Sequence, residues 1–353
     1  MGDLPEVMLA AVYRAPGRIE VEEVPVPRPG PGEVLVEVGH CGVCGSDVHL
    51  MVEGWGRADM VGGHEFSGTV AALGPDAGDW RVGDVVVGGP SPRCGTCRRC
   101  REGRPSQCEA RGGPVLSHAG GAFARYTMLD HRAVVPVPEG MDPRVAALAE
   151  PLAVALHGIT RAGLVSGDSA MVFGAGPIGA LTVAALLARG VAPVRVVEPN
   201  PRRRALAGEL GAHELLEPDD LETYPPWEPE RISARAVDAV LECSGKRAAM
   251  EAGLHQLCRG GRLVLVGAGM EAPSFDPNRL LLNELVVCGS FVYDHDGFDR
   301  AMELLASGAI DAAVLVEPED VGLDGLGEAL SGLASGAVAG KVMVVPDLLA
   351  ARR

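Results

Sequence analysis

The sequence has no apolar run that is long enough to cross a membrane. Its most apolar stretch, residues 178–188 (IGALTVAALLA), is much shorter than the roughly 20 residues that a membrane-spanning helix needs. A basic leader is also missing. The chain starts MGDLPEVMLA, with acidic residues where a signal peptide has positive ones, and no long apolar segment follows. We therefore expect no signal peptide, no membrane partner and a cytoplasmic protein.

Positive charge is scarce as well. The chain has 31 Lys and Arg residues against 47 Asp and Glu residues, which gives a formal net charge of −16. Such a surface repels DNA, RNA and anionic membranes, so we expect a small-molecule substrate and no nucleic-acid partner. The remaining composition, 47% hydrophobic and 22% charged residues, is that of an ordinary soluble globular protein.

Cysteine, in contrast, is plentiful. In a large cytosolic chain, nine cysteines indicate metal binding or catalysis rather than disulfides. Six of them lie between residues 41 and 108. The other three stand alone in apolar or turn-like segments, and we interpret them as small buried hydrophobic residues: Cys243, Cys258 and Cys288.

The length and the texture of the chain predict two domains. A chain of 353 residues exceeds the size at which a single core stops growing. The first 150 residues contain short β-branched runs that glycine and proline interrupt, which is typical of strands. From about residue 144 buried strands alternate with amphipathic helices, as in a parallel sheet covered on both faces. The proline-rich acidic segment 217–233 indicates a surface connection. The predicted fold class is α/β.

A glycine-rich loop in the second region predicts dinucleotide binding. The segment MVFGAGPIGALTVAALLARG has a strand before the loop and a helix after it, the context that makes a GxGxxG pattern informative. Gly174 permits the tight turn, Gly176 lets the backbone approach a pyrophosphate, and Gly179 lets the helix pack closely on the strand. We include Pro177 and Ile178, which open the helix, in the predicted site, since the helix N-terminus offers free N–H groups to phosphates.

The next strand, VRVVE, ends in a carboxylate that bears on the choice of cofactor. Glu198 can accept hydrogen bonds from both ribose hydroxyls of NAD and would repel the 2′-phosphate of NADP. Three arginines follow, Arg202, Arg203 and Arg204, and they could bind a phosphate or form a solvated face. We favour NAD, with NADP as the alternative, and we assign Arg203 to the cofactor site.

A four-cysteine lobe at residues 94–108 predicts a structural zinc site. The segment CGTCRRCREGRPSQC can wrap four thiolates round one tetrahedral ion and leaves no open position for water. Iron–sulfur ligation is the alternative for this spacing. The ligands would be Cys94, Cys97, Cys100 and Cys108.

Three further segments supply the ligand types of a catalytic zinc: CGVCGSDVH (41–49), GGHEFSG (62–68) and LAEPLAVALHG (148–158). Together with the glycine loop and the lobe, in this order, they make the chain similar to the zinc-dependent medium-chain dehydrogenases/reductases. The branch that it resembles contains the sorbitol, butanediol and threonine dehydrogenases. The resemblance extends over essentially the whole chain.

The resemblance implies a GroES-like catalytic domain around a Rossmann domain, with the active site in the cleft between them. We expect the catalytic domain at residues 1–155, the NAD-binding domain at 156–290 and a return to the catalytic domain at 291–353. It also implies association through the Rossmann edge strand near LVVCGSF, as a homodimer or homotetramer, and a cofactor site that includes Val266 and Phe291.

The resemblance further implies a role for each residue of the catalytic site. The zinc ligands would be Cys44, His64 and Glu150, with Glu65 beside the metal as an exchangeable ligand. Ser46 would contact the substrate oxygen, His49 would be the outer end of a proton relay, and Asp47 would accept a hydrogen bond from His64. We expect Cys41 to be a buried thiol. We expect zinc to lower the pKa of the alcohol, and hydride to move to the nicotinamide.

The sequence departs from the polyol dehydrogenases of this branch at two positions. Leu50 replaces an aromatic residue, and Val292 replaces an arginine. Both changes favour a more apolar pocket. The loop between His49 and His64 would form one wall of it, where Trp55 either shapes access or is an ordinary packed surface residue. We expect a secondary alcohol or vicinal diol of modest polarity; a polyol, cyclitol or amino alcohol is the alternative. A zinc-free quinone or enoyl reductase and a non-catalytic zinc-binding interaction protein are the rival interpretations.

Overall fold

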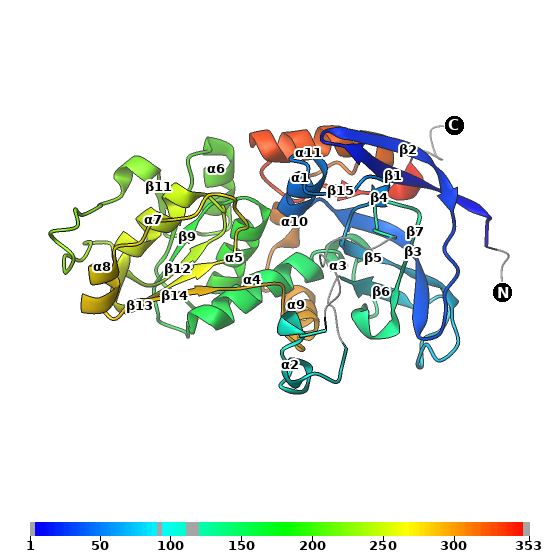
Figure 1. Cartoon of the computed structure of the whole chain (residues 1–353), viewed down its shortest axis with the longest axis horizontal. Helices are drawn as coiled ribbons and strands as arrows, with labels where there is room; N and C mark the ends of the chain where they lie inside the picture. The colour runs from blue at the N-terminus through cyan, green and yellow to red at the C-terminus, as the bar shows by residue number, and fades with distance from the viewer. Residues whose placement is uncertain (1–3, 90–93, 111–119, 349–353) are drawn as a thin grey trace. The chain divides into compact units, whose positions relative to one another are not determined.

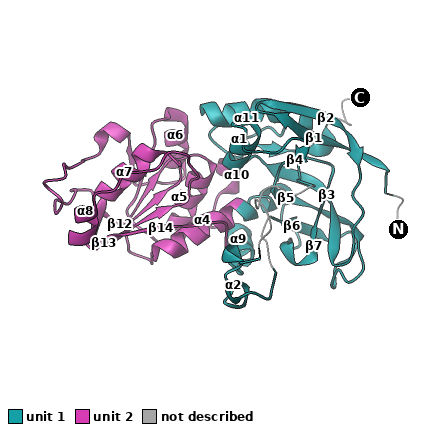
Figure 2. Cartoon of the chain, in the orientation of Figure 1, with its two compact units in different colours: residues 1–150, 294–308, 316–353 teal, residues 151–293, 309–315 magenta. Residues whose placement is uncertain are grey.

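The computed structural model describes residues 4–89, 94–110 and 120–348 of the chain. They form two compact units, drawn in different colours in Figure 2. The first unit comprises residues 1–150, 294–308 and 316–353, and the second comprises 151–293 and 309–315. Among the described residues, no helix is both long and apolar enough to cross a membrane.

The first unit is built on two antiparallel sheets (Figure 1). A three-stranded sheet has the order β2 (Arg18–Pro25), β1 (Val7–Ala15), β4 (Met60–Val61). The other sheet has the order β15 (Met343–Val344), β3 (Glu33–Gly42), β5 (Glu65–Leu73), β6 (Val85–Gly88), β8 (Val134–Pro136), and β7 (Tyr126–Asp130) also pairs with β3. The α-helices among its described residues are α1 (Gly45–Met51), α2 (Arg98–Arg101), α3 (Pro143–Ala146), α9 (Gly297–Ala306) and α11 (Leu326–Ser335).

The core of the first unit joins its sheet to the C-terminal part of the chain. Val34, Val36 and Val38 alternate along β3 and are buried with Phe66 and Val70 of β5. The same cluster contains Val48 and Met51 of α1 and the leucines that α11 directs inward: Leu326, Leu330 and Leu333. Residues that lie nearly 300 positions apart therefore share one core.

The second unit is a doubly wound parallel sheet (Figure 1). Its strand order is β11 (Glu214–Leu216), β10 (Val194–Val197), β9 (Ala170–Phe173), β12 (Val237–Glu242), β13 (Leu257–Leu265), β14 (Val286–Gly289), with every neighbouring pair parallel. Counted along the unit, this order is 3-2-1-4-5-6, the arrangement of dinucleotide-binding sheets. The predicted α/β fold class is confirmed.

Six helices accompany this sheet: α4 (Ala149–Ala162), α5 (Pro177–Ala188), α6 (Pro201–Glu209), α7 (Arg247–His255), α8 (Pro277–Leu282) and α10 (Ala312–Leu315). Helix α5 contains the most apolar run of the sequence, and its residues from Gly179 to Leu186 are all buried. A helix that is apolar on every side is typical of a buried position.

Candidate functional site

A thiolate, an imidazole and a carboxylate meet where β3 and β5 come together in the first unit. Cys44 caps the N-terminus of α1, just after β3 ends, and Glu65 is the first residue of β5. Because β3 and β5 are antiparallel, Gly42 at the end of β3 pairs with Glu65 at the start of β5. One ligand atom each of Cys44, His64 and Glu65 lies within 4.8 Å of the others. This donor set fits a zinc ion.

Asp47 fixes the orientation of the histidine in this group. Its side chain is completely buried, accepts a hydrogen bond from the Cys44 N–H at 3.0 Å, and lies 3.6 Å from His64 Nδ1. Burial acts to lower the pKa of His64, but the Asp47 charge and hydrogen bond outweigh it and raise this pKa well above its usual value. With Nδ1 directed to Asp47, Nε2 faces the other donors, as a metal-binding histidine requires.

Glu65 is held by a buried lysine that the sequence analysis missed. Lys341 Nζ donates a hydrogen bond to Glu65 Oε1 at 2.9 Å and another to the Val43 carbonyl at 3.1 Å, and it forms an ion pair with Glu65 Oε2 at 2.6 Å. Both side chains are almost completely buried. Burial acts to lower the pKa of Lys341, but Glu65 and nearby anionic groups raise it. The available signal was a single basic residue at the start of the apolar segment KVMVV.

Glu150, at the start of α4, is not a member of the group within 4.8 Å that the described residues form. Its carboxylate is buried nevertheless, and it interacts electrostatically with His64 and Glu65. Burial is the main cause that raises the pKa of Glu150 to about 8, with a further contribution from Glu65. A cation beside these carboxylates would offset this cost of burying negative charge.

Two side chains lie on the less buried face of α1. Ser46 Oγ is 3.3 Å from His64 Nε2, so this hydroxyl is next to the predicted metal group. His49 follows Ser46 by three residues and therefore lies on the same face of the helix. The intervening Asp47 and Val48 are buried. Cys41, in contrast, is completely buried, and burial is the main cause that raises the pKa of its thiol well above the usual value.

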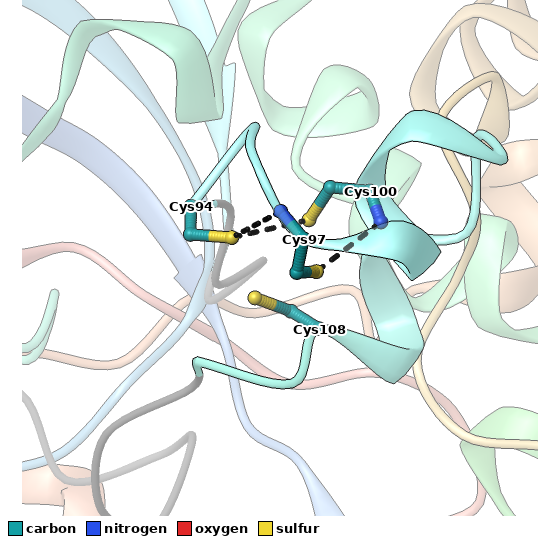
Figure 3. Close-up of side chains that lie close together, drawn as sticks. All are labelled: Cys94, Cys97, Cys100 and Cys108. Carbon is teal, nitrogen blue, oxygen red and sulfur yellow. Dashed lines mark hydrogen bonds between the residues drawn. The ribbon is translucent and has the colours of Figure 1, made fainter.

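The four cysteines of the lobe converge on one point (Figure 3). Their sulfur atoms lie within 4.8 Å of one another, and the Sγ atoms of Cys94 and Cys100 are 3.9 Å apart. Tetrahedral zinc with Zn–S bonds of about 2.3 Å places sulfurs about 3.8 Å apart, so the spacing fits zinc. A four-iron cluster, whose ligands sit on different irons, needs a wider spacing.

Backbone N–H groups support the thiolates of the lobe. Cys97 N donates to Cys94 Sγ at 3.3 Å, and Cys100 N donates to Cys97 Sγ at 3.4 Å (Figure 3). Hydrogen bonds from Cys97 and Thr96 lower the pKa of Cys94 to about 6. All nine cysteines of the chain lie in its described part, and each is a free thiol there. Cys243, Cys258 and Cys288 were expected to be buried, but each is only partly buried.

The glycine loop of the second unit has the geometry that a dinucleotide requires. Gly174 has a φ of +85°, and a Cβ atom there would lie 2.8 Å from Ser244 Cβ. A Cβ atom at Gly179 would lie 1.8 Å from the Gly174 carbonyl oxygen, so only glycine permits α5 to pack this closely. Pro177 and Ile178 open α5, and Gly176 is its N-cap.

The predicted cofactor residues differ in how they are placed. Glu198 is buried, and its carboxylate accepts hydrogen bonds from the N–H groups of Ala175 at 2.7 Å and Asn200 at 2.8 Å. The Arg203 guanidinium is 3.9 Å from the position that a Cβ atom of Gly176 would occupy. Val266 is partly buried after β13, whereas Phe291 is half exposed.

Both units match models of known protein families. A model described as "Alcohol dehydrogenase GroES-like domain" matches residues 30–139, and one described as "Zinc-binding dehydrogenase" matches residues 177–307. Sorbitol dehydrogenase of Bacillus subtilis (strain 168) is 33% identical over 323 residues, which cover 89% of this chain and 90% of that protein.

Solved structures agree with these matches. A zinc-binding dehydrogenase from Sinorhizobium meliloti 1021, bound to NADP, has a TM-score of 0.85 and 31% identity, and the match covers 97% of this chain and 100% of that chain. Acetophenone reductase from Geotrichum candidum, in complex with NAD, has a TM-score of 0.84 and 27% identity, with 98% of each chain covered.

The GroES-like and Rossmann domains, zinc and a nicotinamide cofactor were all predicted, and these comparisons confirm them at the level of the family. The chain belongs to the zinc-dependent medium-chain dehydrogenases/reductases, which are oxidoreductases that act on CH–OH groups with NAD(P).

Proposed function

We propose that the protein interconverts a secondary alcohol or vicinal diol of modest polarity and the matching ketone, with NAD as the preferred cofactor. The observation that carries this proposal is the group of Cys44, His64 and Glu65, with the Ser46 hydroxyl 3.3 Å from His64 Nε2. This donor set argues against the rival interpretation as a zinc-free quinone or enoyl reductase. The glycine loop argues against a non-catalytic interaction protein.

We assign the catalytic zinc to Cys44, His64 and Glu150, with Glu65 as the carboxylate that exchanges with Glu150. Two observations support an exchange: Glu65 already has a cationic partner in Lys341, and Glu150 is buried with its pKa raised to about 8. When bound, zinc supplies a Lewis acid that lowers the pKa of the alcohol. Mixed thiolate, imidazole and carboxylate ligation suits a catalytic zinc.

The residues of this chain then hold the substrate and remove its proton. Asp47 orients His64, and Ser46 contacts the substrate oxygen. The hydroxyl proton would leave by way of Ser46 and His49, one turn further along α1, and a bound nicotinamide cofactor would supply the hydride acceptor.

Of the two positions at which the sequence departs from the polyol dehydrogenases, Val292 supports the proposed substrate class more strongly than Leu50 does. Leu50 is buried in the core of the first unit, so its side chain says little about the pocket. Val292 is partly buried and lacks the charge that an arginine would bring. The relatives include an acetophenone reductase, which acts on an apolar ketone, as well as a sorbitol dehydrogenase, so polyols remain the second candidate.

For the cofactor, Glu198 supports NAD. Its carboxylate is fixed by two N–H groups beside the glycine loop, where it would repel a 2′-phosphate. Because Arg203 lies near Gly176, where it could bind a 2′-phosphate, NADP is the alternative cofactor.

We also propose a cytoplasmic homodimer or homotetramer that associates through the β14 edge of the parallel sheet.

The test is a panel of alcohols with NAD and NADP on the purified, zinc-loaded protein. We expect the highest kcat/KM with NAD and an apolar secondary alcohol or vicinal diol. A strict requirement for a polyol or an amino alcohol would contradict the proposed substrate class. No turnover with any alcohol, despite a full zinc content, would contradict the proposed activity.

A further inference from the structure

The turn that follows α1 folds back toward the imidazole ring of His49. After α1 the chain reverses at Gly54, whose φ is +88°. The reversal lets the Trp55 N–H donate to the His49 carbonyl at 3.1 Å, and the Gly56 N–H donate to the Leu50 carbonyl at 2.9 Å. A Cβ atom at Gly54 would lie 2.9 Å from Pro16 Cγ, so the turn is also packed against the hairpin of β1 and β2.

This turn brings two side chains onto the imidazole. Glu53 Oε2 lies 2.8 Å from His49 Nδ1. The Trp55 indole stacks on the ring, with 4.6 Å between ring centroids and 14° between the planes. One edge and one face of the ring are therefore occupied. We name Glu53 and Trp55 together the His49 clasp.

The hydrogen bond to Glu53 determines which nitrogen can accept a proton. A carboxylate only accepts hydrogen bonds, so Nδ1 carries the proton when the ring is neutral. The lone pair is then on Nε2. The carboxylate also stands beside the positive charge that the ring bears after it has accepted a second proton, and the indole face is attractive to that charge as well.

We propose that Glu53 and Trp55 are positioning residues for the proton relay of this enzyme. Glu53 keeps the proton on Nδ1 so that Nε2 is the acceptor, and Trp55 fixes the plane of the ring. In alcohol oxidation the carbinol carbon loses a hydride to the nicotinamide, the hydroxyl proton arrives at Nε2, and the imidazolium releases one proton to water. The clasp acts only through His49, so this inference rests on the proposed relay role of His49.

The geometry of the clasp suits proton release. The side chain of His49 is 23% exposed and that of Glu53 is 46% exposed, so water reaches the outer side of the pair. A salt bridge at this exposure contributes little to the stability of the fold. Its removal is therefore expected to alter the ring of His49 rather than to unfold the unit.

Three variants and one control test the proposal. Glutamine at position 53 can accept from Nδ1 or donate to it, so Glu53→Gln permits both tautomers. We expect a loss of about tenfold in kcat with little change in KM. NMR of protein labelled at the histidine ring nitrogens should show one protonated Nδ1 for neutral His49 in the wild type and a mixture of tautomers in Glu53→Gln.

Trp55→Leu should also lower kcat, and Trp55→Phe should recover part of the loss because phenylalanine retains a ring for stacking. Glu228→Gln is the matched control. It removes an exposed carboxylate that pairs with Arg231 in the other unit, and it should leave kcat and the His49 tautomer unchanged. Equal melting temperatures for all four proteins would exclude unfolding as the cause.

Substitution of the histidine separates this inference from the relay on which it rests. His49→Ala should lose about hundredfold in kcat and regain part of it in imidazole buffer. Wild-type kcat in His49→Ala would overturn the relay itself. A loss in His49→Ala, together with wild-type kcat and a pure Nδ1–H tautomer in Glu53→Gln, would overturn only the role of the clasp.

Discussion

At the scale of single residues, two side chains of the same type can have different roles because they lie at different positions along the chain. Cys41 and Cys44 are three residues apart, yet the first is enclosed in the core at the end of β3 and the second caps α1 beside His64. The motif CGVCGSDVH and its resemblance to a family were enough to predict this difference. They were not enough to predict Lys341, because its partner Glu65 is 276 positions away.

The two cysteines give a direct prediction. Cys44→Ser should lose the catalytic zinc and nearly all activity, because it removes a thiolate ligand. Cys41→Ser should keep the zinc and most of the activity, since the thiol only fills space in the core. Metal analysis and kcat of both variants check this expectation. Equal damage from the two substitutions would contradict the assignment of Cys44.

A second prediction concerns the buried ion pair of Lys341 and Glu65. Lys341→Met leaves a buried carboxylate without its partner, and we expect it to lower the free energy of unfolding of the zinc-free protein by about 3 kcal/mol. The double variant with Glu65→Gln should recover part of this loss. Urea unfolding measures both values.

Arg247→Met serves as the control, since Arg247 forms an exposed ion pair with Glu251 and should leave the stability unchanged. If Lys341→Met were as stable as this control, the pair would have no structural role.

At the scale of elements, local sequence predicted the chemistry of the glycine loop and of the cysteine lobe. Each is contiguous: the strand, loop and helix around Gly174 follow directly on one another, and the four cysteines lie within residues 94–108. Short spacing limits how such a segment can fold, so ligand geometry follows from the pattern. The His49 clasp is just as local, but its dependence on the turn at Gly54 is visible only in the structure.

The lobe gives a third prediction. In zinc-depleted protein at neutral pH, Cys94, with a pKa of about 6, should be alkylated by iodoacetamide much faster than Cys243, whose pKa desolvation raises to about 12. Zinc should protect the four lobe cysteines, because their sulfurs are then ligands. Mass spectrometry of labelled peptides measures the rates. Labelling of Cys94 no faster than that of Cys243 would contradict the thiolate character of Cys94.

At the scale of the whole molecule, length and texture predicted two domains and the α/β class, and the family resemblance predicted a return to the catalytic domain at residues 291–353, but neither predicted the excursion within that return. The first unit includes residues 294–308 and 316–353, and the short segment 309–315 belongs to the second. Whether a late segment packs on one unit or on the other depends on which surfaces of the folded units are still uncovered. Neither hydrophobic periodicity nor turn residues carry that information.

The edge of the parallel sheet gives the fourth prediction. β14 is an edge strand, and its Val286 is 40% exposed. Two leucines of α8 are more exposed still: Leu281 at 72% and Leu282 at 48%. Exposed edges of this kind invite pairing with a second chain. We expect Val286→Lys to shift the protein toward monomer in light scattering and to leave the zinc content unchanged. An unchanged oligomer would contradict association through this edge.

By itself, the sequence predicted the zinc lobe and the dinucleotide loop of this protein, because each depends on residues at short and fixed spacing. Its resemblance to a family predicted the reaction class. The tertiary structure decided what depends on distant segments. It brought Lys341 to Glu65 and α11 to α1, and it left Glu150 outside the group of Cys44, His64 and Glu65. Contacts over such separations form only when the whole core packs, and no local pattern encodes them.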